Sequence, residues 1–397
     1  MRSEWQTVRA ADVIDFNPTL RLSKGTPSTK IAMEKLLPFT KRVGGTTTES
    51  YAGGSKFCNG DTIMARITPC LENGKTAFID VLRDGEVGFG STEFIVLRAK
   101  PGITDEQYVY YLAISPTFRQ IAIKSMVGSS GRQRVQQSVL DDMVIELPPI
   151  EEQAEIGQCL AKLDDRIALN DRINDNLEQQ IGTLLMAFID EETATPVRLG
   201  DFLYIKGRIG WKGLKKNEYL PESGFRIVNG ETLTKAGIDW SKAGYITEER
   251  YLESPEIMLQ VGDILLSKDG TIGKIGYVDN LDLPTSVASG IFVIRNSQPN
   301  KITTPFIYYL LKSKLFEAFI AARTEGSVIP HLYQKDFMDF VFPLPIPNRM
   351  AEFEQLTSPM FSQVVNNLNE NKALATTRDS LLPRLMSGEI DVTRVPL

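Results

Sequence analysis

Residues 147–188 read LPPIEEQAEIGQCLAKLDDRIALNDRINDNLEQQIGTLLMAF, and this stretch decides how the chain is organised. Two prolines end a strand-like run, and the acidic residues Glu151 and Glu152 then lie in a first helical turn, where the helix dipole stabilises them. The apolar positions that follow alternate at spacings of four and three: Ile156, Leu160, Leu163, Ile167, Leu177, Ile181, Leu184 and Phe188. This spacing is typical of a coiled-coil seam. About 40 residues at a rise of 1.5 Å predict a helix of about 60 Å.

A second long helix is predicted after the proline-rich segment 343–347. Its apolar positions are Phe353, Leu356, Met360, Val364, Leu368, Leu374, Leu381 and Leu385. Asparagines interrupt both seams, and the pair Asn170/Asn174 lies 197 residues before the pair Asn367/Asn371. A helix with a single apolar stripe must bury that stripe. We therefore predict that the two helices form an intramolecular antiparallel coiled coil; the alternative is that each helix is buried within its own half of the chain.

The rest of the chain also occurs twice, at an offset of about 197 to 202 residues. The matching segments are Val8-Arg9 with Val197-Arg198, Gly60–Ile63 with Gly262–Leu265, Phe94–Arg98 with Phe292–Arg295, Tyr108–Leu112 with Phe306–Leu310, and Leu147-Pro148 with Leu344-Pro345. Solenoid repeats have periods of roughly 20 to 50 residues, whereas this offset suits a domain followed by a long helix. The predicted divisions are module one (1–149), a first long helix (150–192), module two (193–346), and a second long helix with a C-terminal tail (347–397).

Both modules have the pattern of an α+β fold. In module one, strand-like runs at Thr62–Ile67, Thr76–Ile79 and Phe94–Leu97 alternate with turns rich in Gly and Asn. A helix follows from Glu106, with a break at Pro116.

The net charge of −6 at first disfavours nucleic acid as a partner, but the acidity is local. Residues 1–149 carry a net charge of +2 and residues 197–347 carry +1, whereas residues 150–196 carry −8. Local clusters decide the affinity for phosphate, so the two modules are compatible with DNA binding. The chain has no apolar run of 18 residues, no apolar signal region at its start, and three scattered cysteines without Cys-x-x-Cys spacing. We therefore expect a cytoplasmic protein with no membrane span and no metal site.

Two matching loops are the main candidates for DNA contact. Residues 128–137 read GSSGRQRVQQ, and residues 326–335 read GSVIPHLYQK. The candidate residues are Arg132, Gln133, Arg134 and Gln136 in the first loop, and His331, Tyr333 and Gln334 in the second. Arginine can donate to guanine or phosphate, and glutamine can pair with an adenine edge, so loops of different composition would recognise different sequences. The alternative is a solvated loop that caps the following strand.

Further candidates are basic residues beside strands and turns: Arg66, Lys75, Arg208, Lys212, Lys268 and Lys274. Arg66 and Lys268 follow the two Gly-Asp strands, and Lys75 and Lys274 follow turn glycines. Arg208 and Lys212 belong to a loop that also contains Trp211. For each of them, an ordinary surface cation is an equally good explanation.

No catalytic constellation is found in the sequence. A glycine-rich nucleotide-binding loop must stand directly before a helix. The glycines Gly270, Gly273 and Gly276 lie instead between strand-like runs. The segment nearest to an amino-methyltransferase motif, Asn17-Pro18-Thr19, lacks the second proline and the aromatic residue. A single histidine leaves little scope for acid–base chemistry. We therefore expect a chain that is not an enzyme and holds no cofactor.

Four motifs together resemble the DNA-specificity subunit of Type I restriction–modification systems: GDTIMARITPCLENGK (60–75), VGSSGRQRV (127–135), LPPIEEQAEI (147–156) and LLPRLMSGEID (381–391). The resemblance covers essentially the whole chain, in both halves and in their order. It implies two target-recognition domains that each bind one half of a bipartite site in double-stranded DNA. The paired helices would then act as a molecular ruler and dock two methyltransferase subunits.

The same resemblance places the chemistry in partner subunits. Methyltransferase subunits would supply S-adenosylmethionine and adenine methylation, and restriction motor-nuclease subunits would supply ATP hydrolysis, Mg and cleavage. Module two lacks the Gly-Arg-Gln-Arg run, so a role for Arg132 and Arg134 has no counterpart there. The alternatives are a DNA methyltransferase or nuclease with unrecognised motifs, or a scaffold whose two modules bind proteins.

Overall fold

The computed structural model describes residues 4–129, 131, 133–208, 213–234, 237–324 and 331–395. The chain divides into two compact units: unit 1 comprises Met1–Arg172 and Leu368–Leu397, and unit 2 comprises Ile173–Asn367. The long helices are α5 (Ile150–Ile189) and α10 (Pro347–Met386). Each unit therefore contains one module and one part of each long helix.

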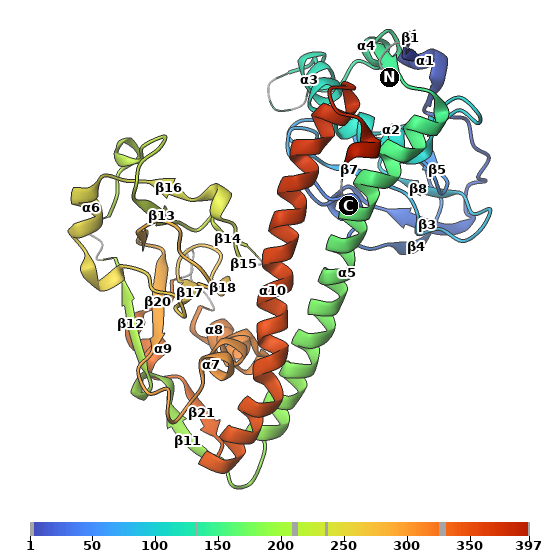
Figure 1. Cartoon of the computed structure of the whole chain (residues 1–397). Coiled ribbons are helices and arrows are strands. Elements are labelled where there is room, and N and C mark those ends of the chain that lie inside the picture. Colours follow the sequence, from blue (N-terminus) through green and yellow to red (C-terminus); the bar gives the residue numbers. More distant parts are fainter. Residues whose placement is uncertain are drawn as a thin grey trace. The chain divides into compact units, whose positions relative to one another are not determined.

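Unit 1 contains two four-stranded sheets, ordered β2-β9-β6-β7 and β4-β3-β8-β5, and a ribbon of β1 and β10 (Figure 1). The strands are β1 (Gln6–Arg9), β2 (Ile14–Phe16), β3 (Pro27–Ile31), β4 (Thr47–Ser50), β5 (Lys56–Phe57), β6 (Thr62–Ala65), β7 (Thr76–Phe78), β8 (Gly88–Gly90), β9 (Phe94–Ala99) and β10 (Val144–Leu147). The shorter helices are α1 (Ala10–Val13), α2 (Glu106–Ile114), α3 (Pro116–Lys124) and α4 (Gln137–Asp141). The ribbon joins the start of the module to the strand that leads into α5, and so closes the module.

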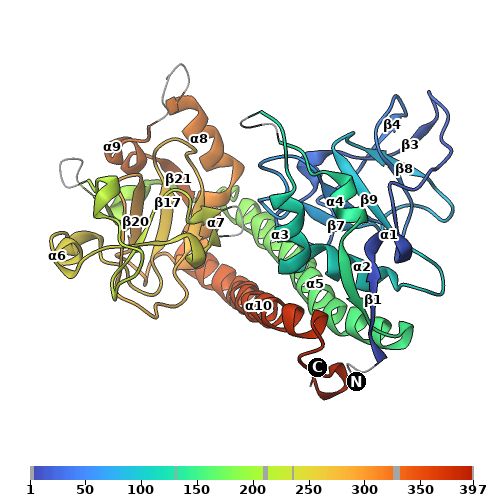
Figure 2. The ribbon, with the colours of Figure 1, turned by 90° about the horizontal axis from the view of Figure 1, so that it is seen from above.

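The helix predicted from Glu106 is confirmed as α2 and α3, with the break at Pro116. The Asp105 carboxylate accepts a hydrogen bond from the Tyr108 amide at the start of α2. Ser115 caps α3 in the same way, and Pro116 occupies the first turn, where its missing amide proton costs nothing. Helix α2 lies beside α5 (Figure 1, Figure 2), and residues of both helices share one hydrophobic core.

Unit 2 repeats this architecture. Its main sheet is ordered β12-β20-β17-β18, a second sheet is ordered β16-β13-β19, β14 pairs with β15, and a ribbon of β11 and β21 closes the module. The strands are β11 (Thr195–Arg198), β12 (Leu203–Gly207), β13 (Arg226–Val228), β14 (Leu233–Thr234), β15 (Gly237–Ile238), β16 (Gly244–Tyr245), β17 (Ile264–Ser267), β18 (Ile275–Tyr277), β19 (Thr285–Val287), β20 (Ile291–Asn296) and β21 (Val341–Leu344). The shorter helices are α6 (Glu248–Leu252), α7 (Thr304–Lys312), α8 (Lys314–Thr324) and α9 (Gln334–Met338).

The repeated Gly-Asp motif serves the fold. The Asp61 carboxylate, 1% exposed, accepts hydrogen bonds from the Cys58 amide (2.8 Å) and from the Arg98 guanidinium (2.6 and 2.7 Å). In unit 2, Asp263 accepts from the Gln260 amide and from Arg295 in the same way. Each pair joins the turn before one central strand to the neighbouring strand of the main sheet, β6 to β9 and β17 to β20.

The long helices pair antiparallel within each unit. In unit 1, Asn170 donates a hydrogen bond to Asn371 (2.9 Å), and Asp164 forms a buried ion pair with Arg378 (2.6 Å). In unit 2, Asn367 donates to Asn174 (2.8 Å). The predicted fold class, two α+β repeats with long paired helices, is confirmed.

One part of the predicted seam is wrong. Leu356 is 43% exposed, and its neighbour Thr357 is fully buried, followed by Phe361. The helix has 3.6 residues per turn, so a pattern assigned with a repeat of 3.5 drifts around the helix and shifts the buried position by one residue. In α5, Leu185 is likewise fully buried, whereas the predicted Leu184 is only partly buried.

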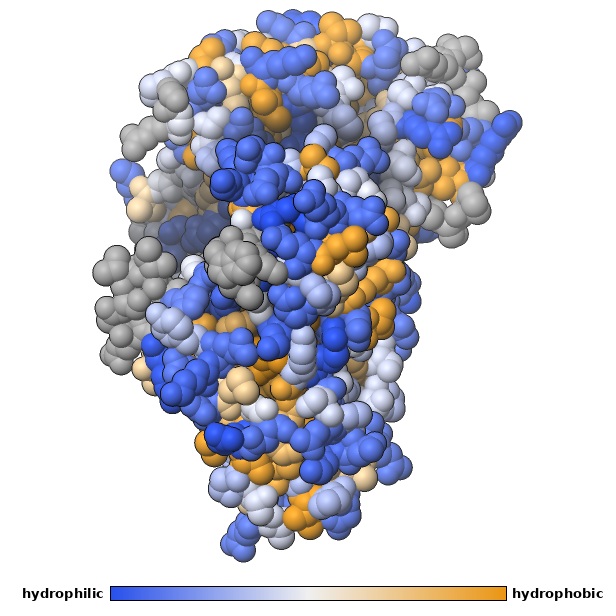
Figure 3. Space-filling view, turned by 90° about the vertical axis from the view of Figure 1, so that its left-hand side faces the viewer, coloured by the Kyte–Doolittle hydropathy of each residue, from blue (hydrophilic) through white to orange (hydrophobic). Residues whose placement is uncertain are grey.

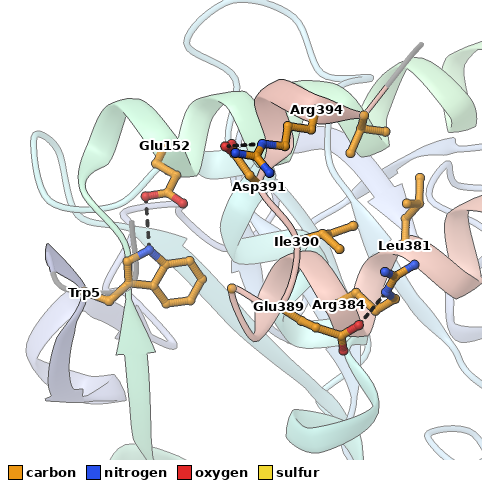
Figure 4. A pocket seen from close by; sticks show the side chains of 10 residues that line it. Trp5, Glu152, Leu381, Arg384, Glu389, Ile390, Asp391 and Arg394 are labelled. Carbon is orange, nitrogen blue, oxygen red and sulfur yellow. Dashed lines mark hydrogen bonds and ion pairs between the residues drawn. The ribbon is translucent and has the colours of Figure 1, made fainter.

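The start and the end of the described chain lie together in unit 1, where Trp5 and residues of the C-terminal tail, among them Ile390 and Arg394, line one pocket of about 520 Å³ (Figure 4). The indole of Trp5 donates a hydrogen bond to Glu152 in the first turn of α5 (3.0 Å). Arg384 pairs with Glu389 (2.7 Å), which holds the tail against the end of α10. The first contact ties the residue before β1 to α5, and the second ties the C-terminal tail to α10.

Candidate nucleic-acid interface

In module one, residues 133–136 lie against the end of strand β6. The Val135 amide donates a hydrogen bond to the Arg66 carbonyl (2.8 Å), and the Thr68 amide donates to the Gln133 carbonyl (3.1 Å). The Arg134 amide donates in turn to the Val127 carbonyl (2.9 Å). These backbone hydrogen bonds fix the segment that follows the predicted Gly/Ser loop, and they bring the candidates Arg66, Gln133 and Arg134 together.

Arg134 and Arg66 share one carboxylate, that of Glu93, which precedes β9. Arg134 is bound through Nε (3.0 Å) and Nη2 (2.5 Å), and Nε of Arg66 lies 3.8 Å from the same group. The side chain of Arg134 is half exposed, whereas that of Glu93 is 22% exposed. Hydrogen bonds from Arg134 hold the pKa of the Glu93 carboxyl below its ordinary value. The candidate arginine is thus held at the surface by an ionised carboxylate.

Module two has the same backbone arrangement with different side chains. The Leu332 amide donates to the Lys268 carbonyl (2.9 Å), as the Val135 amide does to Arg66. His331 therefore occupies the position of Arg134, and its Nδ1 is hydrogen-bonded to the Asp269 carboxylate. The exposed Tyr333 ring packs edge-on against the imidazole, with 4.5 Å between the ring centroids. Lys268 lies over the Phe292 ring at 5.1 Å.

The remaining glutamines lie at the same two places. Gln136 is exposed just before α4, and its amide donates to the Ser125 hydroxyl (3.3 Å). Gln334 begins α9, and its side chain lines a pocket of about 360 Å³ together with Lys335.

Lys75 and Lys274 turn their ammonium groups toward their own modules. Lys75 donates to the Met33 carbonyl (3.0 Å), and Lys274 donates to the Gly230 carbonyl (3.1 Å). Each lysine thereby ties a loop to the turn before the last strand of the main sheet. This geometry favours a structural role for both residues.

Arg208 is buried, with 2% of the residue exposed. Its guanidinium donates to the Val287 carbonyl (3.1 Å) and to the Ser286 hydroxyl (3.4 Å), and burial lowers its pKa. The prediction that Arg208 contacts DNA is at odds with this burial, which removes the side chain from the surface. The candidates Arg132 and Lys212 lie outside the described residues.

The sequence reasoning missed the two carboxylates, Glu93 and Asp269. Neither belongs to a repeated motif. The position of Asp269 is occupied by Ile67 in module one, and the position of Glu93 is occupied by Gly290 in module two. Only the folded chain shows that each carboxylate lies beside the candidate residue of its own module.

The described residues contain no group of three or more His, Cys, Asp or Glu side chains that could hold a metal ion. Among them, no helix is long and apolar enough to cross a membrane. The face shown in Figure 3 is mainly hydrophilic, with hydrophobic residues in scattered groups.

Comparison with known families decides what this fold is. The sequence-family model described as the Type I restriction modification DNA specificity domain matches residues 2–179 and again residues 191–374. The chain belongs to this family. As a DNA-specificity subunit of the Type I restriction–modification class, it carries one copy of the family's domain in each repeat, together with most of the long helix that follows.

Individual relatives agree with this assignment. The specificity subunit of the Type I restriction enzyme EcoAI from Escherichia coli is 32% identical over 82% of this chain and 70% of its own length. The MjaIX specificity subunit from Methanocaldococcus jannaschii is 27% identical over 74% of this chain and 71% of its own length. A crystal structure of a Type I S subunit from M. genitalium, 19% identical, shares the fold with a TM-score of 0.56 over 96% of both chains.

Proposed function

We propose that this specificity subunit recognises a bipartite site in double-stranded DNA, and that each module binds one half of the site. The observation that carries the proposal is the pair of equivalent positions 134 and 331. The residue after each donates the equivalent backbone hydrogen bond, Val135 to Arg66 and Leu332 to Lys268, yet one position carries arginine and the other histidine. Two side chains with different donor and acceptor patterns select different base edges.

The subunit directs adenine methylation by two methyltransferase subunits. With restriction motor-nuclease subunits added, it also directs the cleavage of foreign DNA in the cytoplasm. S-adenosylmethionine, ATP and Mg belong to those partners, and the specificity subunit itself has no catalytic role. The absence of a cofactor loop or a nucleophile–base pair from the sequence supports this division of labour.

The decisive experiment expresses the chain with its methyltransferase subunits in a host that lacks other adenine methylation, and maps the modified adenines. We expect one motif with two specified halves and an unspecified spacer of constant length. Methylation at a continuous motif, or none that depends on the chain, would overturn the proposal.

The non-catalytic role has its own test. The isolated chain should show no binding of S-adenosylmethionine at micromolar concentrations by calorimetry, whereas the complex with methyltransferase subunits should bind it. Micromolar binding to the isolated chain would favour the alternative of an enzyme.

A further inference from the structure

We propose that Glu93 and Asp269 are positioning residues, which orient the base-contacting side chains Arg134 and His331 and so determine the sequence preference of each half. This inference deepens the proposed function and rests on it, because it assigns the residues within each module that discriminate between bases. The unit of recognition is then a pair, a surface donor or acceptor with its carboxylate, rather than a single side chain.

The two pairs occupy the same place in the two modules. Residues 135 and 332 donate equivalent hydrogen bonds to residues 66 and 268, and the amides of residues 66 and 268 donate to the carbonyls of residues 93 and 290. Positions 134 and 331 are therefore equivalent, as are positions 93 and 290. The backbone that presents the side chain is conserved between the repeats, although the side chain itself is not.

The two carboxylates come from different positions in the sequence of their modules, but each lies beside the presented side chain, Arg134 or His331. In module one the carboxylate is Glu93, whose counterpart in module two is Gly290. A Cβ atom placed on Gly290 would lie 3.6 Å from both Cβ and Oδ2 of Asp269, in ordinary van der Waals contact. Each module thus fills one and the same position beside the presented side chain with a carboxylate, by a different route. Because both modules have a carboxylate at this position from non-equivalent residues, we attribute to it a role in orienting the side chain that it binds.

Stability does not explain these pairs. Ion pairs with half-exposed partners contribute little to folding. A carboxylate on a surface that faces phosphates also weakens DNA binding through charge repulsion. Such a residue is useful if it improves discrimination, because it orders a long side chain before binding and disfavours bases that present acceptors near the carboxylate.

The two pairs predict different base preferences. Glu93 occupies Nε and Nη2 of Arg134, which leaves the other N–H groups of the guanidinium for acceptors such as guanine O6 and N7. Asp269 engages Nδ1 of His331 and so favours the tautomer with a proton on that nitrogen. In that neutral tautomer Nε2 is a hydrogen-bond acceptor, which suits the amino group of adenine or cytosine.

The test uses the complete complex of the chain with its methyltransferase subunits and a library of DNA duplexes with randomised bases. Bound duplexes are sequenced for the wild type, Glu93→Gln and Asp269→Asn, and the affinity for a poly(dI-dC) duplex is measured in parallel. In each variant we expect discrimination to fall by about 5- to 100-fold at one position in the half-site of its own module. Affinity for poly(dI-dC) should stay the same or rise, because a negative charge is lost.

Two further variants complete the design. Glu49→Gln removes one charge from an exposed ion pair with Lys30 elsewhere in module one, and it should leave the selected motif unchanged. Arg134→Lys keeps the charge without the planar fork, so it should lose discrimination as Glu93→Gln does while its binding keeps the same salt dependence.

The outcomes separate this inference from the proposed function. If the wild-type complex selects no bipartite motif, the proposed function fails. If the wild type selects a motif and both carboxylate variants select the same motif with the same stringency, only the present inference is overturned. An equal loss of affinity for selected and poly(dI-dC) duplexes would also overturn it, since that result shows general damage to the module.

Discussion

Asp61 and Asp263 belong to the most visible repeated motif, yet their side chains are only 1% exposed and each is bound by an arginine of the neighbouring strand. A buried carboxylate is tolerated only when charge and hydrogen bonds compensate for its lost hydration. The repetition of Asp61 with Arg98 and of Asp263 with Arg295 thus reflects the needs of the two main sheets. Residues that are identical in the two modules, such as these pairs, stabilise the fold, whereas the candidate DNA contacts Arg134 and His331 differ between the modules.

Removing the arginine from one of these pairs should destabilise only its own unit. We expect Arg98→Ala to cost about 3 kcal/mol, because the buried Asp61 carboxyl would lose the cation that compensates for its burial. Hydrogen exchange resolved by peptide should show lower protection in unit 1 and unchanged protection in unit 2. Arg295→Ala is the matched variant, with the reverse pattern expected. Unchanged protection in the mutated unit would contradict the structural role of the pair.

Glu86 gives unit 1 a component of stability that is sensitive to acid. Its carboxylate accepts hydrogen bonds from the Thr29 amide (2.9 Å) and the Arg83 amide (3.0 Å), and these lower its pKa from 4.5 to about 2. Because the folded-state pKa lies below the unfolded one, the contribution is complete above pH 4.5 and is lost as the pH falls toward 2. Glu86→Gln should therefore lower the Tm at pH 7, with a difference from the wild type that shrinks between pH 4.5 and 2. A difference that is independent of pH would argue against this account.

At the scale of elements, the two modules attach to the long helices by different chemistry. In unit 1, the Tyr111 hydroxyl donates to Asp164 of α5 (2.6 Å), and Asp164 also binds Arg378 of α10 (2.6 Å). All three residues are buried. In unit 2, the equivalent residues are Tyr309, Phe361 and Ile181, which lie in one hydrophobic core with Tyr309 packed edge-on against Phe361.

This difference predicts contrasting effects of single and double substitutions. Arg378→Ala should destabilise unit 1 by about 3–5 kcal/mol, because the buried Asp164 carboxyl would lose the cation that compensates for its burial. Asp164→Phe combined with Arg378→Ile, which installs the residues found in unit 2, should cost far less. Thermal unfolding of the wild type, the single variant and the double variant measures both effects. A double variant at least as unstable as Arg378→Ala would show that the ion pair is needed for more than mutual compensation.

The asparagines in the long helices explain why the apolar seams are interrupted. Asn170 is bound to Asn371 in unit 1, and Asn174 to Asn367 in unit 2. A buried amide pair loses its hydrogen bonds if the helices shift by one turn, so these residues specify the register at some cost in stability.

For the whole molecule, the repeat predicts two recognition functions that can be exchanged separately. Replacing residues 1–147 with the equivalent segment of a relative should change one half of the methylated motif and leave the other half intact. The physical reason is that each module has its own sheets, its own core and its own presented side chain. Mapping of methylated adenines checks the result, and a simultaneous change in both halves would contradict independent recognition.

The number of residues in the long helices should set the spacer of the motif. One heptad inserted after Arg172 in α5, with another after Asn367 in α10, leaves the helix contacts within each unit as they are. We expect a changed spacer length or loss of methylation, since a heptad adds about 10 Å to a helix. Four residues inserted into α5 alone should disrupt the pairing and abolish methylation. An unchanged spacer in the double insertion would rule out a ruler function for these helices.

The internal repeat, the hydrophobic spacing and the positions of the prolines were sufficient to predict the architecture from the sequence. The offset of about 200 residues, the prolines before Ile150 and within 343–347, and the break at Pro116 predicted the repeats, the two long helices and the division of α2 from α3. The repeat is read by comparing the two halves of the sequence, and the other signals are local, because proline geometry and hydrophobic spacing act over a few residues. The predicted burial of Leu356 failed for the same reason, since a local pattern cannot define which neighbour in a turn faces the core.

Only the tertiary structure decided the candidate site. Glu93 lies 41 residues from Arg134, and Asp269 lies 62 residues from His331, so their pairing depends on how β-strand ends and loops meet in space. In the sequence Arg208 belongs to a basic loop, which predicts an exposed side chain, but the fold buries this side chain. Ion pairs and hydrogen bonds between residues far apart in the sequence leave no periodic pattern in it, whereas the helices and their caps are determined by residues that are close together along the chain.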